Sequence, residues 1–147
     1  MPQSLTKLYA HLTFSTKNRQ HWLDDEIRPR VHGYLATVIR ELESPWVVVG
    51  GVDDHVHILF DIGKKTAPVK FVEQVKRESS KFVKTLGTKY GRFYWQRGYG
   101  MFSVSSKDRD EAEHYVRNQE EHHRTRSYQD EYRAILSKYD IEFDERY

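Results

Sequence analysis

The sequence predicts an α+β domain in which an antiparallel sheet carries helices on one face. Stretches with alternating apolar residues, typical of strands, lie between longer stretches whose apolar residues recur every three or four positions, as on one face of a helix. The tight connection Asp53-Asp54 joins two such strands in what looks like a hairpin, and Gly98-Tyr99-Gly100 is a turn between two shorter strands. The predicted element order, β-α-β-β-α-β-α, indicates a ferredoxin-like or RRM-like sheet followed by a C-terminal helix.

The first half of the chain predicts a strand, a helix and a hairpin. Leu8–Ser15 is expected to form a strand because it mixes alternation with residues that favour strands. Asp25–Glu43 predicts an amphipathic helix, with Pro29 near its start, where a missing amide hydrogen is tolerated. The apolar positions of this helix are Ile27, Val31, Leu35, Val38 and Leu42. Trp46–Val52 and His55–Ile62 predict two strands joined by a tight turn.

The middle of the chain predicts a second helix and two short strands. Thr66 is expected to cap a helix that has Pro68 in its first turn. The apolar face of this helix consists of Val69, Val72, Val75, Phe82 and Leu86. Arg92–Gln96 and Met101–Ser105 predict strands around the turn Gly98-Tyr99-Gly100.

The C-terminal part predicts a long helix, capped by Ser106 or Asp108, that runs to about His123. After Ser127, a short apolar pattern indicates a further helical segment. No repeat, linker or low-complexity stretch divides the chain, so residues 1–147 are expected to form a single domain.

Composition narrows the classes of function. The chain contains 7 Phe, 3 Trp and 10 Tyr, which is too aromatic for a disordered segment. It has no cysteine, which excludes disulfides, thiolate metal sites and a cysteine nucleophile. Its longest apolar runs are far shorter than the roughly 20 residues that span a bilayer, and its first residues lack the apolar core of a signal peptide. We therefore expect a soluble, cytoplasmic protein with no membrane partner.

Positive charge is concentrated in one segment, although the net charge of the chain is only +2. Residues 64–97 carry ten Lys or Arg against two Glu. Such an excess suits a polyanion, and nearby aromatic rings could stack on the bases of single-stranded nucleic acid. The candidate DNA phosphate contacts are Lys76, Arg77, Lys81, Lys84 and Arg92. A solvated helix face above core aromatic residues would explain the same pattern.

The sequence His55-Val56-His57 is the first candidate site. In a strand, residues two apart project from the same face about 7 Å apart, so two imidazoles can converge on one metal ion while Val56 points into the core. The preceding Asp53 and Asp54 could orient the imidazoles as hydrogen-bond acceptors. Two half-exposed sheet histidines without a ligand would give the same spacing.

Tyr115 and Gln119 form the second candidate. Four residues apart on a helix, they share one face. A phenol can be a covalent nucleophile, and an amide oxygen is a plausible metal ligand. Alternatively, Tyr115 packs on the sheet and Gln119 is a solvated surface residue. His122 and His123, on the same predicted helix, could be extra ligands, phosphate contacts or neither.

In combination, these features resemble the small single-tyrosine HUH transposases (histidine, hydrophobe, histidine) of insertion sequences that move as single-stranded DNA. The REP-associated tyrosine transposases are a looser match. The resemblance rests on His55-Val56-His57, Trp95–Gly100, Tyr115, Gln119 and Glu121-His122-His123. It implies that His55 and His57 bind a divalent metal, Mg²⁺ or Mn²⁺. It also implies that Gln119 is the third ligand and that Tyr115, on a C-terminal catalytic helix, is the nucleophile.

The resemblance further implies products and partners. Attack by Tyr115 would leave a 5′-phosphotyrosine and a free 3′-hydroxyl, so bond energy is conserved and no nucleotide cofactor is needed. The expected partners are single-stranded DNA hairpins near the element ends and a second copy of the chain. Family members are homodimers in which the catalytic helix can complete the partner's site, which leaves open whether Tyr115 acts within its own chain.

Three other functions remain open from the sequence. A non-catalytic RRM-like module would bind nucleic acid through aromatic residues of the sheet. An HUH nickase for replication or conjugation would share the chemistry, although such enzymes are usually fused to further domains. A metal-dependent phosphodiesterase would use water in place of Tyr115 and release products with no protein attached.

Overall fold

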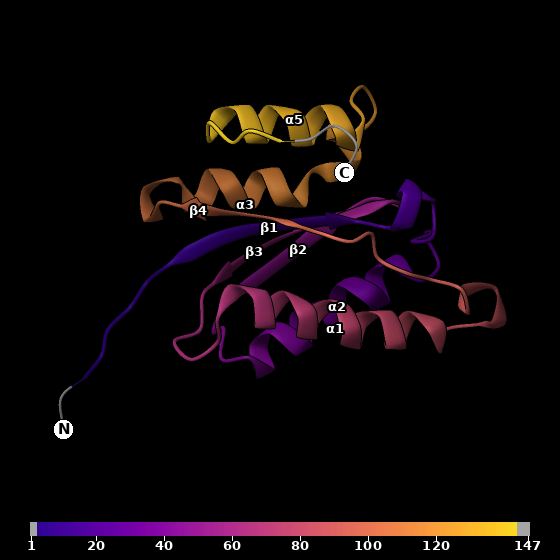
Figure 1. Ribbon diagram of the computed structural model, residues 1–147, viewed down its shortest axis with the longest axis horizontal. Helices are drawn as coiled ribbons and strands as arrows, with labels where there is room; N and C mark the ends of the chain where they lie inside the picture. The colour runs from indigo at the N-terminus through magenta and orange to yellow at the C-terminus, as the bar shows by residue number, and fades with distance from the viewer. Residues whose placement is uncertain (1–2, 144–147) are drawn as a thin grey trace.

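The computed structural model describes residues 3–143 and confirms the predicted α+β fold (Figure 1). Its antiparallel sheet has the order β2-β3-β1-β4, so β1 and β3 are central and β2 and β4 are the edges. The strands are β1 (Tyr9–Ser15), β2 (Val47–Gly51), β3 (His55–Asp61) and β4 (Gly100–Val104). Each lies within one residue of its predicted range at either end. Residues 1–2 and 144–147 of the predicted domain lie outside the described residues.

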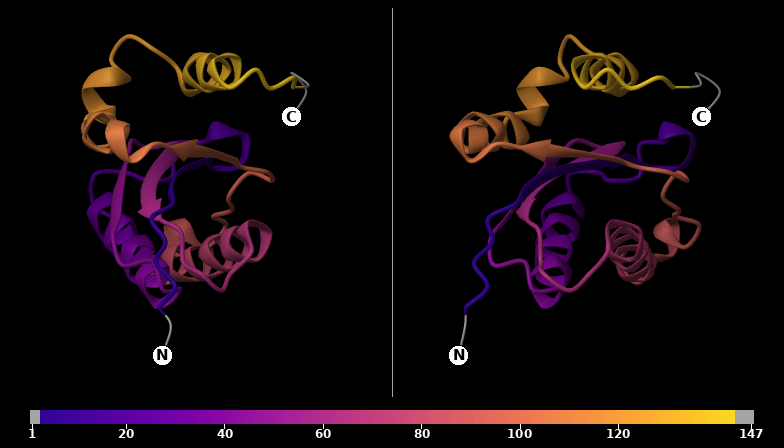
Figure 2. Two further views of the ribbon diagram at one scale, coloured as in Figure 1. Left: turned by 90° about the vertical axis from the view of Figure 1, so that its left-hand side faces the viewer. Right: turned by 60° about the vertical axis from the view of Figure 1, so that its left-hand side comes forward.

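Two helices cover one face of the sheet, α1 (Arg28–Glu41) and α2 (Pro68–Lys84) (Figures 1 and 2). Alternation along β3 turns Val56, Ile58 and Phe60 toward these helices, where all three are buried in the hydrophobic core. Each such side chain contributes roughly 1.5–3 kcal/mol on burial. This layer therefore anchors the sheet and leaves the opposite face available for polar side chains.

Three helices follow β4 and lie on the opposite side of the sheet: α3 (Arg109–Arg117), α4 (Gln119–His122) and α5 (Tyr128–Lys138). The prediction that the helices pack on one face is therefore wrong, because the C-terminal helices cover the face that carries the histidine pair. In Figure 2, α5 crosses above the sheet as a separate layer, joined to α4 by a short loop. The predicted short helical segment after Ser127 is thus a full helix, and Ser127 caps it by accepting a hydrogen bond from the Asp130 amide.

The predicted single helix up to about His123 is wrong in one respect, because the helix breaks at Asn118, where φ is −103° and ψ is 33°. The Asn118 side chain donates a hydrogen bond to the His114 carbonyl oxygen at 2.7 Å, in competition with the helical backbone. Asp108, one of the two predicted caps, occupies the N-cap position of α3 but makes no side-chain cap hydrogen bond. Ser105 caps the preceding 3-10 turn by accepting a hydrogen bond from the Lys107 amide. The break places Tyr115 and Gln119 on separate helices.

Two further local predictions are wrong. Arg92–Gln96 is not a strand; within it, Trp95 forms one isolated bridge with Thr16, while Phe93 turns into the core. Thr66 does not cap α2, because that helix begins two residues later and has no capping side chain. None of the helices between residues 3 and 143 has the length and apolar character that a membrane crossing requires.

The edge strand β2 and helix α3 approach each other closely at Gly50. A β-carbon at this position would lie 1.8 Å from the Val116 carbonyl oxygen, far inside any allowed contact. Gly50 is also the register partner of His57 in β3. The absent side chain therefore seats α3 directly on the sheet, beside the second histidine of the motif.

Candidate active site

Strand alternation places both histidines of the motif on the face opposite the hydrophobic core. His55 and His57 share this face with Leu59, which packs against α3, whereas Val56 is buried in the core as predicted. Both imidazoles are fully buried, with ring centroids 5.1 Å apart. They are therefore not the half-exposed sheet histidines of the alternative interpretation.

Tyr115 of α3 and Gln119 of α4 meet this pair within the same chain. The Tyr115 ring lies 5.6 Å from the His57 ring, and Gln119 Oε1 lies 3.3 Å from His55 Nε2. Gln119 Nε2 donates a hydrogen bond to the Tyr115 carbonyl oxygen at 3.1 Å, which turns the amide oxygen toward the imidazoles. Gln119 is buried, so it is not a solvated surface residue. The fold thus brings four residues together from three separate elements.

Glu131 of α5, which the sequence did not single out, lies at the centre of the cluster. Its side chain is 1% exposed. Oε1 accepts a hydrogen bond from His57 Nε2 at 2.7 Å and lies 3.5 Å from His55 Nε2. Oε2 accepts a hydrogen bond from the Tyr115 hydroxyl. One carboxylate therefore contacts both the histidine pair and the tyrosine.

The two histidines at the end of α4 also face this carboxylate. His123 Nε2 lies 3.0 Å from Gln119 Oε1 and 3.2 Å from Glu131 Oε1. The other nitrogen of this ring, Nδ1, donates to the Arg126 carbonyl oxygen at 2.6 Å, which turns Nε2 toward the cluster. His122 Nε2 lies 3.1 Å from Glu131 Oε2. Of the roles left open for these histidines, the position of His123 matches that of an additional ligand.

A second layer of contacts orients the histidine pair. His55 Nδ1 donates to Asp54 Oδ1 at 2.7 Å, which leaves Nε2 facing the cluster. His57 Nδ1 lies 2.7 Å from Nε2 of His11 in β1. Asp53, the other predicted orienting carboxylate, pairs instead with His21, 2.9 Å away. Asp54 and His11 thus hold the two rings in the manner typical of imidazoles that bind a metal.

Burial and hydrogen bonding set the charges in the cluster. Burial tends to raise the pKa of Glu131, but hydrogen bonds from three histidines outweigh it and hold that pKa well below its usual range. Burial lowers the pKa of His57 to about 4, against the raising effect of Glu131. Burial also opposes protonation of His55, yet hydrogen bonds to Asp54 and Glu131 raise its pKa overall. Burial and the hydrogen bond to Glu131 raise the pKa of Tyr115, so the phenol stays neutral.

The donor set fits a divalent cation. The nearest atoms of His55, His57, His123 and Glu131 all lie within 4.8 Å of one another, and the amide oxygen of Gln119 faces the same point. The oxygens of Glu131 and Gln119 that face the cluster are both acceptors, so they repel each other unless positive charge lies between them. A proton on His55 or a metal ion would supply that charge.

The predicted DNA contacts lie on a different side of the molecule, on or next to α2, in the layer that covers the other face of the sheet (Figure 1). Lys76 Nζ donates to the carbonyl oxygens of Gln96 and Gly98 at 2.6 and 2.9 Å, and burial lowers its pKa to about 8. Arg77 lies beside Glu78, and Lys84 lies over the Tyr94 ring. The remaining two candidates, Lys81 and Arg92, are exposed. Lys81 and Arg92 are thus the candidates most accessible to a phosphate.

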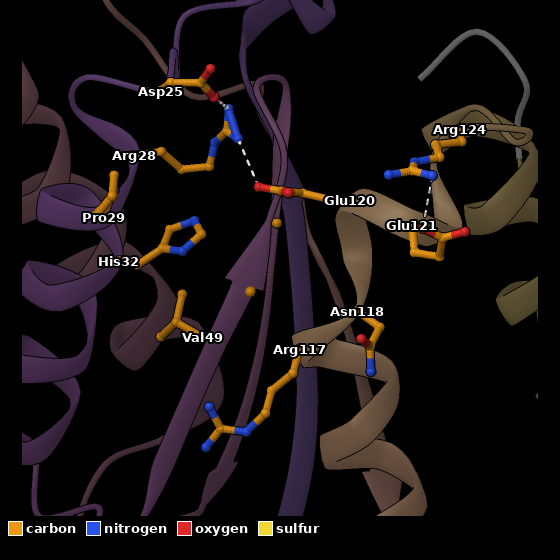
Figure 3. A pocket seen from close by; sticks show the side chains of 12 residues that line it. Asp25, Arg28, Pro29, His32, Val49, Arg117, Asn118, Glu120, Glu121 and Arg124 are labelled. Carbon is orange, nitrogen blue, oxygen red and sulfur yellow. Dashed lines mark hydrogen bonds and ion pairs between the residues drawn. The ribbon is translucent and has the colours of Figure 1, made fainter.

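A groove of about 560 Å³ runs along the edge strand β2, between α1 and the α3–α4 break (Figure 3). Arg28 reaches across it, 2.7 Å from Asp25 and 3.4 Å from Glu120. His32 of α1 lines the same groove, and burial lowers its pKa to about 4. Since acidic and basic side chains alternate here, the groove has no clear preference for a polyanion.

Sequence reasoning missed Glu131 because only the apolar positions of the C-terminal segment indicated a helix there. The sequence nevertheless contained an indication of its position. Glu131 lies on the face of α5 that carries Tyr128 and Leu136 and that is turned toward the sheet. Tyr128 packs on His55 with 4.3 Å between ring centroids, and its hydroxyl lies 3.2 Å from Thr13 Oγ1. A charged residue on such a face must be paired, which points to a buried polar partner.

Comparisons with known proteins agree with this geometry. Among solved structures, a candidate transposase from Deinococcus radiodurans R1 matches with a TM-score of 0.63 and 24% identity, over 81% of this chain and 98% of that one. A REP-associated tyrosine transposase bound to a REP hairpin matches with a TM-score of 0.52 and 14% identity, over 79% of this chain and 68% of that one. Both likenesses concern the fold, and a search of curated proteins found no match. The family model described as "Transposase IS200 like" matches residues 4–119, and the chain therefore belongs to the IS200-like transposases.

Proposed function

We propose that this transposase cuts and rejoins single-stranded DNA at the ends of an insertion sequence through a covalent bond to Tyr115. The observation that carries the proposal is the meeting of the buried His55, His57 and Gln119 with the half-buried Tyr115 in one cluster. These residues span sixty-five positions of the sequence, and no packing requirement demands that four polar side chains converge. Membership of the transposase family supports the same chemistry.

The proposed nucleophile is the Tyr115 hydroxyl. In the cutting step, a bond forms between Tyr115 Oη and phosphorus, and the bond between phosphorus and the 3′-oxygen breaks. The products are a 5′-phosphotyrosine and a DNA strand whose 3′-oxygen takes up a proton. Attack by the 3′-hydroxyl of another DNA end reverses the step and releases Tyr115, so no nucleotide cofactor is consumed. The hydrogen bond from Tyr115 to Glu131 fixes the direction of the phenol before DNA arrives.

His55, His57 and Gln119 would hold the divalent metal of this reaction, Mg²⁺ or Mn²⁺. A bound divalent ion polarises the scissile phosphate and neutralises the charge that develops on it. The protein's part is to keep both Nε2 atoms and the amide oxygen turned to one point, through Asp54, His11 and the Tyr115 carbonyl. Because imidazole nitrogen suits manganese better than magnesium, we expect Mn²⁺ to bind more tightly.

The decisive experiment is detection of a covalent protein–DNA adduct. Protein, Mn²⁺ and a labelled single-stranded hairpin are incubated, denatured and separated on a gel. Wild type should give a shifted band that survives denaturation, and Tyr115→Phe should give none while still binding the hairpin. Tyr34→Phe, on α1 in the other layer, is the control and should behave as wild type. An adduct that persists in Tyr115→Phe, or cleaved DNA with no protein attached, would refute the assignment.

The proposed partners are a DNA hairpin and a second copy of the chain. A structural neighbour that is bound to a REP hairpin supports the first, and we propose that the homodimer acts in the cytoplasm. The basic residues on and near α2 are proposed to contact phosphates. Replacing Lys81 and Arg92 by Gln should weaken hairpin binding and reduce the slope of log affinity against log salt by about 0.7 for each phosphate that is no longer neutralised. Arg40→Gln, an exposed cation of α1, should leave that slope unchanged. Equal slopes for all three proteins would remove Lys81 and Arg92 from the interface.

A further inference from the structure

We propose that α5 is part of the metal centre, with Glu131 and His123 as ligands in addition to His55, His57 and Gln119. This inference rests on the proposed function, because it concerns the same ion. It goes beyond that function in assigning five protein ligands where the motif supplies three. It also gives α5, which lies outside the residues 4–119 that match the family model, a direct chemical role.

The separations between the donor atoms carry the proposal. Glu131 Oε1 lies 2.7, 3.2 and 3.5 Å from Nε2 of His57, His123 and His55. Gln119 Oε1 lies 3.0 Å from His123 Nε2 and 3.3 Å from His55 Nε2. Adjacent ligands placed 2.0–2.2 Å from one ion are about 3.0 Å apart in an octahedron and about 3.4 Å apart in a tetrahedron. Three of these five separations fall between these two values, and the other two, 2.7 and 3.5 Å, lie just outside them.

The orientation of each ring supports the same assignment. His123 Nδ1 donates to the Arg126 carbonyl oxygen, and His55 Nδ1 donates to Asp54, so each ring turns Nε2 inward. A histidine that binds a metal through one nitrogen usually donates its other N–H to a carbonyl or carboxylate. His123 therefore meets the same structural criterion as His55, one of the two motif histidines.

The burial of Glu131 needs an explanation that packing does not provide. A carboxylate that is 1% exposed is costly unless it is paired, yet α5 could bury an apolar residue at this position. The two oxygens have separate partners, since Oε1 faces the imidazoles and Oε2 accepts from Tyr115. As a ligand through Oε1, Glu131 would keep Oε2 for the hydrogen bond to the nucleophile and so connect the metal to Tyr115.

The ligand chemistry predicts the preferred ion. Three imidazole nitrogens and two oxygens suit Mn²⁺ or a later transition metal, whereas Mg²⁺ prefers oxygen ligands and retains several waters. If the ion takes six ligands, five from the protein would leave one position for a phosphate oxygen of DNA. Discrimination against Mg²⁺ should therefore be stronger than a two-histidine, one-amide site would give.

The test measures Mn²⁺ binding to the DNA-free protein, by calorimetry and by electron paramagnetic resonance. Glu131→Gln and His123→Ala should each weaken Mn²⁺ at least tenfold, and His123→Ala should reduce the number of coordinated nitrogens from three to two. Glu121→Gln removes an exposed carboxylate of α4 and should leave the affinity within twofold of wild type. Circular dichroism checks that each variant is folded. If one of the two ligand variants does not fold, the other still tests the proposal.

The outcomes separate this proposal from the proposed function. Wild-type affinity in both Glu131→Gln and His123→Ala would overturn the role of α5 while leaving the three-ligand site and the Tyr115 adduct intact. Tyr34→Phe, on α1 in the other layer, should bind Mn²⁺ as wild type does, whatever the result of the adduct experiment. If His55→Ala also binds Mn²⁺ as wild type does, the metal lies elsewhere and both proposals about it are wrong.

Discussion

Replacement of Gly50 by Ala tests the close contact that positions α3. A β-carbon at this position would lie 1.8 Å from the Val116 carbonyl oxygen, and an ordinary contact is 3.4 Å, so the helix backbone must retreat by about 1.6 Å. Overpacking of this kind costs typically 1–3 kcal/mol. For a chain of this size, 2 kcal/mol lowers the melting temperature by roughly 4–8 °C.

The displacement of α3 should also slow the proposed reaction, because Tyr115 immediately precedes Val116 in this helix. A misplacement of about 1 Å at a reacting group costs on the order of 100-fold in rate. We therefore expect Gly50→Ala to form the Tyr115–DNA adduct about 100-fold more slowly than wild type, at a temperature where both proteins are folded. The two measurements are thermal unfolding followed by circular dichroism and the time course of the adduct.

Gly33→Ala is the matched control for this prediction. Gly33 lies within α1, and a β-carbon there would have no neighbour within 4 Å. Alanine in a helix interior is favoured over glycine by about 0.5–1 kcal/mol, so this variant should be slightly more stable and fully active. If Gly50→Ala were as stable and as fast as Gly33→Ala, the close seating of α3 on β2 would not be what positions the tyrosine.

Two further predictions concern stability. Ser79→Ala should lower the free energy of unfolding by about 1–2 kcal/mol, because the buried Trp95 indole N–H loses the acceptor that it contacts at 2.9 Å; urea titration checks this, and a loss no larger than that of Ser80→Ala would contradict it. His32→Leu should reduce the acid sensitivity of folding. Burial holds the pKa of His32 at about 4, below the value near 6.5 in the unfolded chain. As pH drops from 6.5 to 4, His32 therefore takes up a proton in the unfolded chain but not in the folded protein. The free energy of unfolding falls over this range by up to about 3 kcal/mol from this residue. Unfolding curves at pH 7 and pH 4.5 should differ less for His32→Leu than for wild type, and equal differences would disprove the role of His32.

The spacing of apolar residues predicted the sheet and the first two helices well, because in these elements the apolar positions are the ones that face the core. The strand that contains His55 and His57 was predictable for the same reason, and so was the inward position of Val56. The break at Asn118 was not predictable from periodicity, since it depends on a competition between one side-chain amide and the helical backbone. Its effect is to put Tyr115 and Gln119, which a continuous helix would hold rigidly together, on two short helices.

Predicting the site was harder than predicting the fold, because the cluster depends on contacts between distant segments. Spacing alone could pair His55 with His57 and Tyr115 with Gln119. It could not show that Glu131 lies between them, since that contact requires α5 to cross back over the sheet. A glutamate in a charged C-terminal segment looks like an ordinary solvated residue until its burial is known.

The cluster is completed by α5, which follows every other described element along the chain. A chain that terminated before residue 128 would keep the sheet, the histidine pair and Tyr115, yet it would lack the acidic group that faces them. If α5 supplies a ligand, truncated products of translation would be poorly loaded with metal and slow to damage the genome. The proposed cleavage of DNA would then begin only in chains that have been synthesised through α5.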